Sequence, residues 1–189
     1  MALHLASTPD ANALLERDPL ALLLGMLLDQ QIPMEKAFTS PHVLAERLGV
    51  ERLDARQLAS YDPEALLEVF RTPPALHRFP GSMAERTQAL CQALVDRFDG
   101  RAERVWDDAA TGEEVVRRMS SLPGFGAQKA KIFTALLGKR YGVRPPGWEQ
   151  AAGDYGTEGF RSIADVTDDA SRVKVREYKK AAKAAAKAG

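Results

Sequence analysis

The sequence predicts an all-α fold, and three observations support this prediction. With 189 residues, of which 45% are hydrophobic, the chain is long enough to bury a core. Several positions carry the residues that begin helices, and the alternating pattern typical of strands is nearly absent. Residues 2–6 (ALHLA) are the stretch that best fits a short strand. We therefore expect helices joined by short turns.

Helix starts are marked at four points by residues whose side chains accept hydrogen bonds from unpaired backbone N–H groups. Two are Asp-Pro pairs, with proline at the first helical position, and two are capping boxes of the pattern S/T-x-x-E. They are Asp18-Pro19, Asp62-Pro63, Ser82-Met-Ala-Glu85 and Thr111-Gly-Glu-Glu114. Together with the apolar periodicity, they predict helices near residues 10–16, 19–30, 34–48, 63–70, 82–98, 112–120, 127–141 and 169–186.

The expected helix at residues 19–30 is apolar on nearly every side. A helix of this kind is normally the buried centre of a helical domain, and Gly25 would let a neighbouring element approach closely. The apolar run at 20–28 is far shorter than the roughly 20 residues of a membrane helix, and charged residues flank it. Because no secretory signal pattern opens the chain, we expect a cytoplasmic protein.

Charge is unevenly distributed along the chain, although the formal net charge is zero. Between Ser171 and Gly189 there are seven basic residues and one acidic residue, so this tail carries +6 and the remainder −6. Such a tail can bind phosphates, or it can be a solvated helix or a frayed end. Cys91 is the single cysteine and the three histidines are scattered. The sequence therefore predicts no metal site, no iron–sulfur cluster and no other cofactor.

Two amphipathic helices are expected to meet at residues 122–126 (LPGFG), one at 112–120 and one at 127–141. The glycines of this turn allow positive φ and carry no Cβ, so their backbone N–H groups can face outward. Outward amides beside a helix start favour an anion such as a phosphate, and Lys129 and Lys131 would add positive charge. A contact of this kind holds nucleic acid without reading its sequence. The alternative is a tight connector that binds nothing.

Three segments resemble the helix-hairpin-helix DNA glycosylases related to endonuclease III, the HhH-GPD superfamily. The turn at 122–126, followed by AQKA and an apolar helix, is similar to the hairpin of that family. Residues 27–31 (LLDQQ) resemble its LLsxQ segment, and residues 79–86 (FPGSMAER) resemble its GfyrxKA helix start. Order and spacing agree over roughly residues 19–150. The resemblance implies two helical lobes containing a helix-hairpin-helix motif, here at about 112–141.

The resemblance also implies how DNA would be held. Enzymes of this family rotate a damaged base out of the duplex into a pocket between the lobes, and a side chain fills the gap in the stack. Gln31 matches the gap-filling glutamine, although an ordinary polar residue at a helix end would look the same. The hairpin amides would hold a phosphate beyond the lesion. The expected DNA-binding residues are Gln31, Leu122, Gly124, Gly126, Gln128, Lys129 and Lys131.

Three aromatic residues are candidates for stacking on the flipped base: Phe79, Trp148 and Tyr155. Aromatic residues near loops also serve as anchors of the hydrophobic core, and this second interpretation fits all three as well.

Breaking an N-glycosidic bond requires a carboxylate near C1′, because positive charge develops on the sugar. In the family this aspartate follows the second hairpin glycine by about twenty residues, where this chain has Pro146. An alignment with one extra helical turn places Glu149 there instead, and Asp154 is the reserve. The nucleophilic lysine of bifunctional members corresponds to Gln128, and Lys129, rotated by about 100° on the helix, is expected to point elsewhere.

We therefore expect a monofunctional DNA glycosylase of base-excision repair, acting on double-stranded DNA that contains a damaged base, and nucleoid-associated when bound. Residues 1–168 would form the HhH-GPD-like helical domain, and residues 169–189 a basic helix or tail that contacts nucleic acid. One alternative is a non-catalytic protein of the same fold that binds distorted duplex. Another is a helical protein–protein interaction module, which the near-neutral charge favours.

Overall fold

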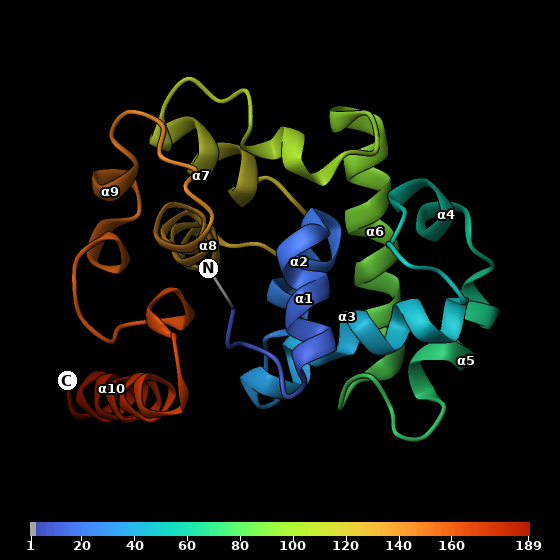
Figure 1. Ribbon diagram of the computed structural model, residues 1–189, viewed down its shortest axis with the longest axis horizontal. Coiled ribbons are helices and arrows are strands. Elements are labelled where there is room, and N and C mark those ends of the chain that lie inside the picture. The colour runs from blue at the N-terminus through green and yellow to red at the C-terminus, as the bar shows by residue number, and fades with distance from the viewer. Residues whose placement is uncertain (1–2) are drawn as a thin grey trace.

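The structure, a computed structural model, describes residues 3–189, and within this range every regular element is a helix (Figure 1). The prediction of an all-α fold is confirmed. The α-helices are α1 (Pro9–Arg17), α2 (Pro19–Leu28), α3 (Met34–Leu48), α4 (Ala55–Ser60), α5 (Pro63–Arg71), α6 (Pro80–Phe98), α7 (Gly112–Ser120), α8 (Ala127–Arg140), α9 (Trp148–Ala151) and α10 (Asp169–Ala188). Three 3₁₀ helices complete them: η1 (Ala102–Val105), η2 (Gly153–Gly156) and η3 (Ile163–Asp165).

Helix α2 lies at the centre of the molecule, as its apolar sequence predicts. Every residue from Leu20 to Leu28 is buried. A Cβ on Gly25 would lie 2.4 Å from Cδ1 of Phe38, so the glycine lets α3 pack directly against α2. In Figure 1, α3 to α6 lie on one side of α1 and α2, and α8 to α10 lie on the other. The central helix therefore has neighbours on both sides.

Three of the four predicted caps are present. Asp18 accepts hydrogen bonds from the N–H groups of Leu20 and Ala21, and Asp62 accepts one from Ala65. The Thr111 hydroxyl accepts a hydrogen bond from the N–H of Glu114, as in the first half of a capping box.

The expected box at Ser82 is wrong. Helix α6 begins earlier, at Pro80, because its N-cap is Phe79 and the proline occupies the first turn. The short helices α4 and α9 are additional to those expected from the sequence.

The N-terminal segment is not a strand over the residues that the structure describes, and Ala2 of the predicted strand lies outside them. The N–H groups of Leu5 and Ala6 donate to Oδ1 of Asn12, at 3.0 and 2.9 Å. A side chain of α1 therefore supplies the acceptors that a neighbouring strand would otherwise provide.

Residues 142–168, between α8 and α10, wrap around α8. Lys139 pairs with Asp165 at 2.6 Å and donates to the carbonyl of Thr157 at 2.7 Å, and both charged side chains are largely buried. Arg140 donates to the carbonyl of Ala164. These contacts from the last turn of α8 hold η3 in place. Three residues, 166–168, separate η3 from α10, and the last of them, Asp168, is the N-cap of α10.

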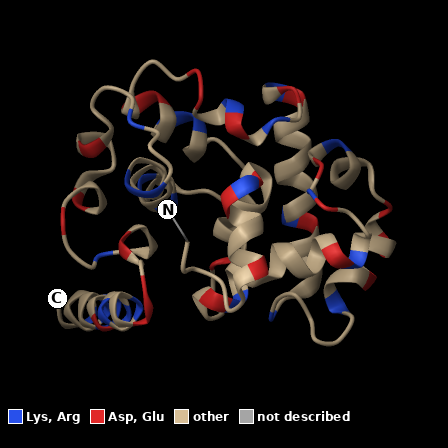
Figure 2. Ribbon diagram, viewed as in Figure 1, with Lys and Arg blue, Asp and Glu red and all other residues tan. Residues whose placement is uncertain are grey.

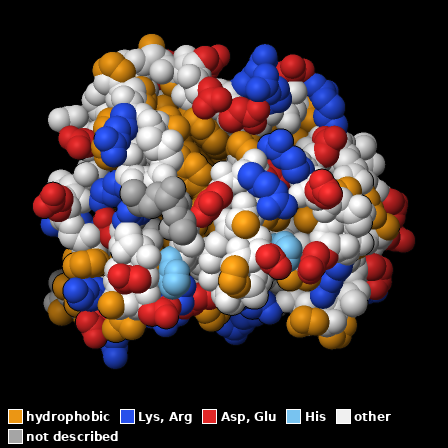
Figure 3. Space-filling view, viewed as in Figure 1, with side chains coloured by type: hydrophobic (Ala, Val, Ile, Leu, Met, Phe, Trp, Pro, Cys, Tyr) orange, Lys and Arg blue, Asp and Glu red, His pale blue; other side chains and the backbone are white. Residues whose placement is uncertain are grey.

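Charges of both signs occur on α1, α3, α5, α6 and α7, and α2 carries none (Figure 2). The charged residues of α8 are all Lys or Arg, and Lys and Arg outnumber the acidic residues on α10. On the face shown in Figure 3, acidic and basic side chains are intermingled. No helix in the described part of the chain has the length and apolar character needed to cross a membrane.

Candidate functional site

The hairpin between α7 and α8 is built around a glycine that no other residue could replace without strain. Gly124 has φ of +83°, and a Cβ there would lie 2.2 Å from Cδ1 of Leu27 on α2. Leu122 and Phe125 are buried on either side of it, and the Phe125 ring packs edge-on against Phe133 with centroids 6.3 Å apart. Two buried side chains and one close approach therefore fix the turn against the central helix.

The start of α8 exposes backbone N–H groups. Gly126 is its N-cap, is exposed, and would have nothing within 4 Å of an added Cβ. The helix has no side-chain cap, and the first N–H groups of any α-helix lack partners within the helix. The positive end of the helix dipole adds to this arrangement. The turn can therefore accept an anion, as the sequence predicts for a phosphate.

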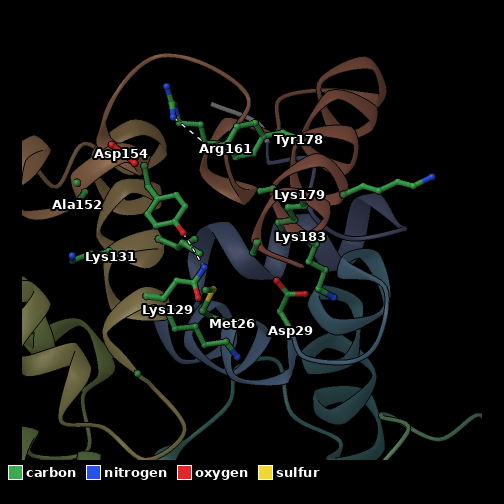
Figure 4. Close-up of a pocket in the computed structure, with 18 residues that line it drawn as sticks. Met26, Asp29, Lys129, Lys131, Ala152, Asp154, Arg161, Tyr178, Lys179 and Lys183 are labelled. Atoms are coloured by element: carbon green, nitrogen blue, oxygen red, sulfur yellow. Dashed lines mark hydrogen bonds between the residues drawn. The ribbon is translucent and has the colours of Figure 1, made fainter. Parts of the chain in front are cut away.

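A cavity of about 1010 Å³ opens beside this helix start (Figure 4). One wall comes from the end of α2, with Met26 and Asp29, and from α8, with Gln128 and Lys129. Residues 152–155 form a second wall. The basic half of α10 forms the third, through residues that include Tyr178, Lys179 and Lys183. The cavity is large enough to enclose a nucleobase and its sugar.

The turn that follows α2 is held by three side chains. The Gln30 side-chain amide donates to the carbonyl of Leu27 at 2.8 Å, and Arg86 donates to Oε1 of Gln30 at 2.8 Å. Nε2 of His77 lies 3.1 Å from the carbonyl of Leu28 and 3.0 Å from that of Gln30. Burial lowers the pKa of His77, which favours the neutral ring that the site accommodates. The positions of Asp29 and Gln31 are therefore set by their neighbours.

Two ionisable groups in the cavity have displaced pKa values. Burial raises the pKa of Asp29, while the charges of Lys179 and Lys129 act in the opposite direction. Burial lowers the pKa of Lys129 to about 8, although the charge of Asp29 partly offsets it. The amine of Lys129 donates to the carbonyl of Leu27 at 3.1 Å. Near neutral pH both groups face the cavity with reduced hydration, which strengthens their effect on any charge placed there.

Several residues singled out in the sequence meet in this cavity. Gln128 donates to the hydroxyl of Tyr155 at 2.9 Å, so the helix start and η2 are joined across it. Lys129 also lines the cavity, although it points in a different direction from Gln128: its amine donates to the Leu27 carbonyl of α2. The other members are Gly126, Lys131 and Asp154. Figure 4 shows Lys131 directed away from Asp29.

Other predicted residues lie outside the cavity wall. Glu149 is exposed on α9, one residue after Trp148. The Trp148 ring packs on Gly138, where an added Cβ would lie 2.3 Å from it, so this residue anchors α9 to α8. Phe79 is 41% exposed at the start of α6, and Gln31 is exposed with φ of +57°.

Cavity-lining residues that the sequence did not single out are Asp29, Arg161 and Tyr178, while Lys179 and Lys183 were counted in the basic tail without a place at a site. Asp29 lies inside the LLDQQ segment, but a polar residue often ends an apolar helix, so its presence there did not indicate a role in a site. The α10 residues belong to the basic tail, whose position beside the cavity depends on the fold of residues 142–168. A charge pattern alone does not place them.

The comparison with protein families agrees with this architecture. Residues 24–184 match the HhH-GPD superfamily of base excision DNA repair proteins. The match takes in the end of α2, the hairpin and most of α10, and the chain belongs to this superfamily. A search of curated proteins gave no significant match. The fold and the hairpin thus define a DNA-binding repair protein of the glycosylase class.

Proposed function

We propose that the protein is a monofunctional DNA glycosylase, which hydrolyses the N-glycosidic bond of a damaged base rotated out of double-stranded DNA. The observation that carries the proposal is the cavity of about 1010 Å³ directly beside the start of α8. It offers two carboxylates, two tyrosines and several lysines next to a hairpin suited to a phosphate. A flipped base would enter the cavity while the hairpin holds the strand.

The phosphate contact would involve the N–H groups of Gly124, Gly126 and the first turn of α8. Gly126 is exposed and its helix has no side-chain cap. Leu122 is buried, so it would act through the backbone of the turn, while Lys131 supplies a nearby charge. Such contacts position the duplex without selecting its sequence.

Gln31 would fill the gap left in the base stack, and Tyr155 would stack on the extruded base. Gln31 is exposed and is carried by a turn whose preceding residue is fixed by Arg86. Tyr155 is the member of the three aromatic candidates that lines the cavity, within the described part of the chain. Its hydroxyl is already held by Gln128, which orients the ring.

Hydrolysis without strand cleavage is supported by the residue at the position of the nucleophilic lysine. Gln128 occupies that position, and an amide cannot form a Schiff base. The amine of Lys129 lines the same cavity but donates a hydrogen bond to the Leu27 carbonyl at 3.1 Å, which holds it at the end of α2. Water is therefore the proposed attacking group, with Glu149 or Asp154 as the carboxylates first indicated by the sequence.

We further propose that residues 1–168 form the catalytic helical unit and that the basic helix at 169–189 adds phosphate contacts. The protein would act in the cytoplasm, at the nucleoid. Lys179 and Lys183 of this helix line the cavity, which favours a role beside the bound strand rather than a free tail.

The test is an excision assay on labelled duplexes, each carrying one lesion among uracil, alkylated purines and oxidised bases. Each reaction is developed with and without alkali, because a monofunctional enzyme leaves an abasic site that breaks only in alkali. Glu149→Gln and Asp154→Asn are run beside the unaltered protein. Strand breaks without alkali would instead indicate lyase chemistry. Salt-sensitive binding with no product from any lesion would favour the non-catalytic DNA-binding protein, and no DNA binding would favour the protein–protein module.

A further inference from the structure

Asp29 is a carboxylate that faces the cavity and has no partner in the described part of the chain. It caps the C-terminal end of α2 and lines the cavity. Among residues 3–189, its carboxylate takes part in no hydrogen bond and no ion pair within 4.0 Å. The residues on either side of it are fixed, since the Leu28 and Gln30 carbonyls both contact His77. Burying a carboxylate without a hydrogen-bond partner lowers the stability of the folded protein. An unpaired buried group of this kind therefore calls for a functional explanation.

The charges around Asp29 come from three elements. Lys129 on α8 and Lys179 on α10 favour the ionised carboxylate, while Glu35 on α3 and burial oppose it. Glu35 is occupied by Arg172 and Arg176 of α10, so it is not free to act in the cavity. The negative charge of Asp29 is therefore supported by lysines but is not neutralised by a direct contact (Figure 4).

The other two candidate carboxylates, Asp154 and Glu149, are less suited to act in the cavity. Within the described residues, Asp29 and Asp154 are the carboxylates that line the cavity, and Glu149 does not. Asp154 is exposed in the 3₁₀ helix η2, where water screens its charge. Asp29 is half-buried and comes from the end of α2, in the turn that carries Gln31. A carboxylate in a less hydrated site stabilises a nearby cation more strongly.

We propose that Asp29 is the carboxylate that faces C1′ of the flipped nucleotide, with the ammonium group of Lys129 lining the same cavity. This inference rests on the proposed glycosylase function and moves the acid from the segment after α8 to the end of α2. The family's expected position, Pro146, cannot supply it. Two helices would then have separate roles: the start of α8 would hold the phosphate, and the end of α2 would face the positive charge on the sugar.

The reaction step balances as a hydrolysis. The bond between C1′ and the base nitrogen breaks, and its electron pair leaves with the base, which takes up one proton. The positive charge left on the sugar lies against the Asp29 carboxylate. The oxygen of water then forms the new bond to C1′, and the proton that this water loses passes to Asp29 and on to solvent. The products are a free base and an abasic sugar.

The experiment measures binding to two abasic duplexes that differ in the charge of the sugar analogue. One carries a neutral tetrahydrofuran and the other a cationic pyrrolidine, which mimics the sugar cation without requiring the natural lesion to be known. Dissociation constants are measured for the unaltered protein and for Asp29→Asn, which keeps the shape of the side chain. Asp154→Asn and Glu149→Gln test the two competing carboxylates, and Asp10→Asn, at an exposed acid of α1 outside the cavity, is the matched control. Thermal unfolding checks that each variant is folded.

We expect the unaltered protein to prefer the cationic duplex by about tenfold or more, and Asp29→Asn to lose this preference while binding the neutral duplex unchanged. The control Asp10→Asn should keep the preference, and so should the variants of the two competing carboxylates. Loss of the preference in Asp154→Asn or Glu149→Gln but not in Asp29→Asn would overturn the inference, and so would equal affinities in the unaltered protein. Absence of excision from every lesion, with the Asp29-dependent preference intact, would instead count against the proposed function alone.

Discussion

Nζ of Lys129 lies 3.1 Å from the carbonyl oxygen of Leu27 and donates a hydrogen bond to it, which joins the second hairpin helix to the end of the central helix. The same carbonyl accepts a hydrogen bond from Gln30. One peptide group of α2 thus links the hairpin to the turn that carries Asp29 and Gln31. Because the linking group is an ammonium in a partly buried place, the link depends on pH.

The first prediction concerns this dependence. The pKa of Lys129 falls from 10.5 to about 8 on folding, so between these values the unfolded chain holds a proton that the folded protein has released. The free energy of unfolding contributed by this group therefore rises with pH over that window. We expect the difference in unfolding free energy between the unaltered protein and Lys129→Met to shift by about 2 kcal/mol in favour of the unaltered protein from pH 7 to 9.5.

Chemical denaturation at several pH values measures this shift, and Lys131→Met, an exposed lysine on the same helix, is the control. The comparison between variants matters because burial also raises the pKa of the Cys91 thiol to about 12, which acts with the opposite sign above pH 9. That contribution is common to all three proteins and cancels. If the difference in unfolding free energy does not change with pH, Lys129 has the same pKa in the folded and unfolded states, and the prediction is wrong.

The second prediction tests the hairpin. Gly124→Ala forces a positive φ on a residue with a Cβ and drives that Cβ to within 2.2 Å of Leu27. Left-handed strain of about 1–2 kcal/mol and overpacking of similar size predict a loss of about 2–4 kcal/mol in unfolding free energy. Gly126→Ala is the control, since its φ is −86° and it has open space, and it should cost well under half as much. Urea unfolding compares the two, and equal losses would contradict the packing argument.

The parts of the fold that depend on residues close together in the sequence could be predicted from it. The Asp18 and Asp62 caps and the all-apolar α2 each depend on neighbours within a few residues, and each was predicted correctly. The capping box predicted at Ser82 was wrong because two helix-start patterns overlap there. The S-x-x-E pattern lies inside a helix that begins at Pro80. Residues 142–168 were not readable, because their course is set by Lys139, which pairs with Asp165 across 26 positions of sequence.

The cavity shows the same limit. The hairpin turn could be placed because its glycines and its helix start are contiguous. The third wall could not, because Lys179 and Lys183 reach the cavity only after the chain has wrapped around α8. Lys129 was expected to point away by comparison with Gln128, yet both line the cavity, since it spans more than one residue of the helix face. Two neighbouring helix residues point about 100° apart, so they cannot both line a narrow pocket, but they can both line a broad one.

The third prediction is the pH profile of excision. It distinguishes a protonated Lys129, which acts by its charge, from a neutral Lys129, which would act as a nucleophile. If Asp29 acts ionised beside a protonated Lys129, the single-turnover rate rises as Asp29 ionises and falls as pH passes about 8. The other charges facing the pair are Lys179, Glu35 and Arg86. Lys129→Arg should keep its charge and lose the alkaline fall, while Lys129→Met should shift the acid limb to higher pH. A rate that rises through pH 8 would make the neutral amine the reactive form.

The fourth prediction concerns Gln31. Its side chain is exposed and its neighbours are fixed without it, so Gln31→Ala should leave the unfolding free energy within about 0.5 kcal/mol of the unaltered protein. Affinity for a lesion-containing duplex should fall by about tenfold, because the space left by the flipped base is no longer filled. Gln128→Ala, which breaks the bond to Tyr155, is the comparison within the cavity. Unchanged affinity in Gln31→Ala would remove it from the DNA interface.

The last prediction tests whether α10 meets the DNA strand. Lys179 and Lys183 line the cavity, whereas Lys174 lies over the Phe160 ring and Lys187 is exposed near the end of the same helix. Replacing Lys179 and Lys183 with glutamine removes two charges at the cavity, and replacing Lys174 and Lys187 removes two charges elsewhere on α10. If the cavity-facing pair contacts phosphates, the slope of log affinity against log salt should become shallower by about 2 in the first variant, with a much smaller change in the second. Equal changes would mean that the helix contributes only long-range attraction, since net charge alone would then account for its effect on binding.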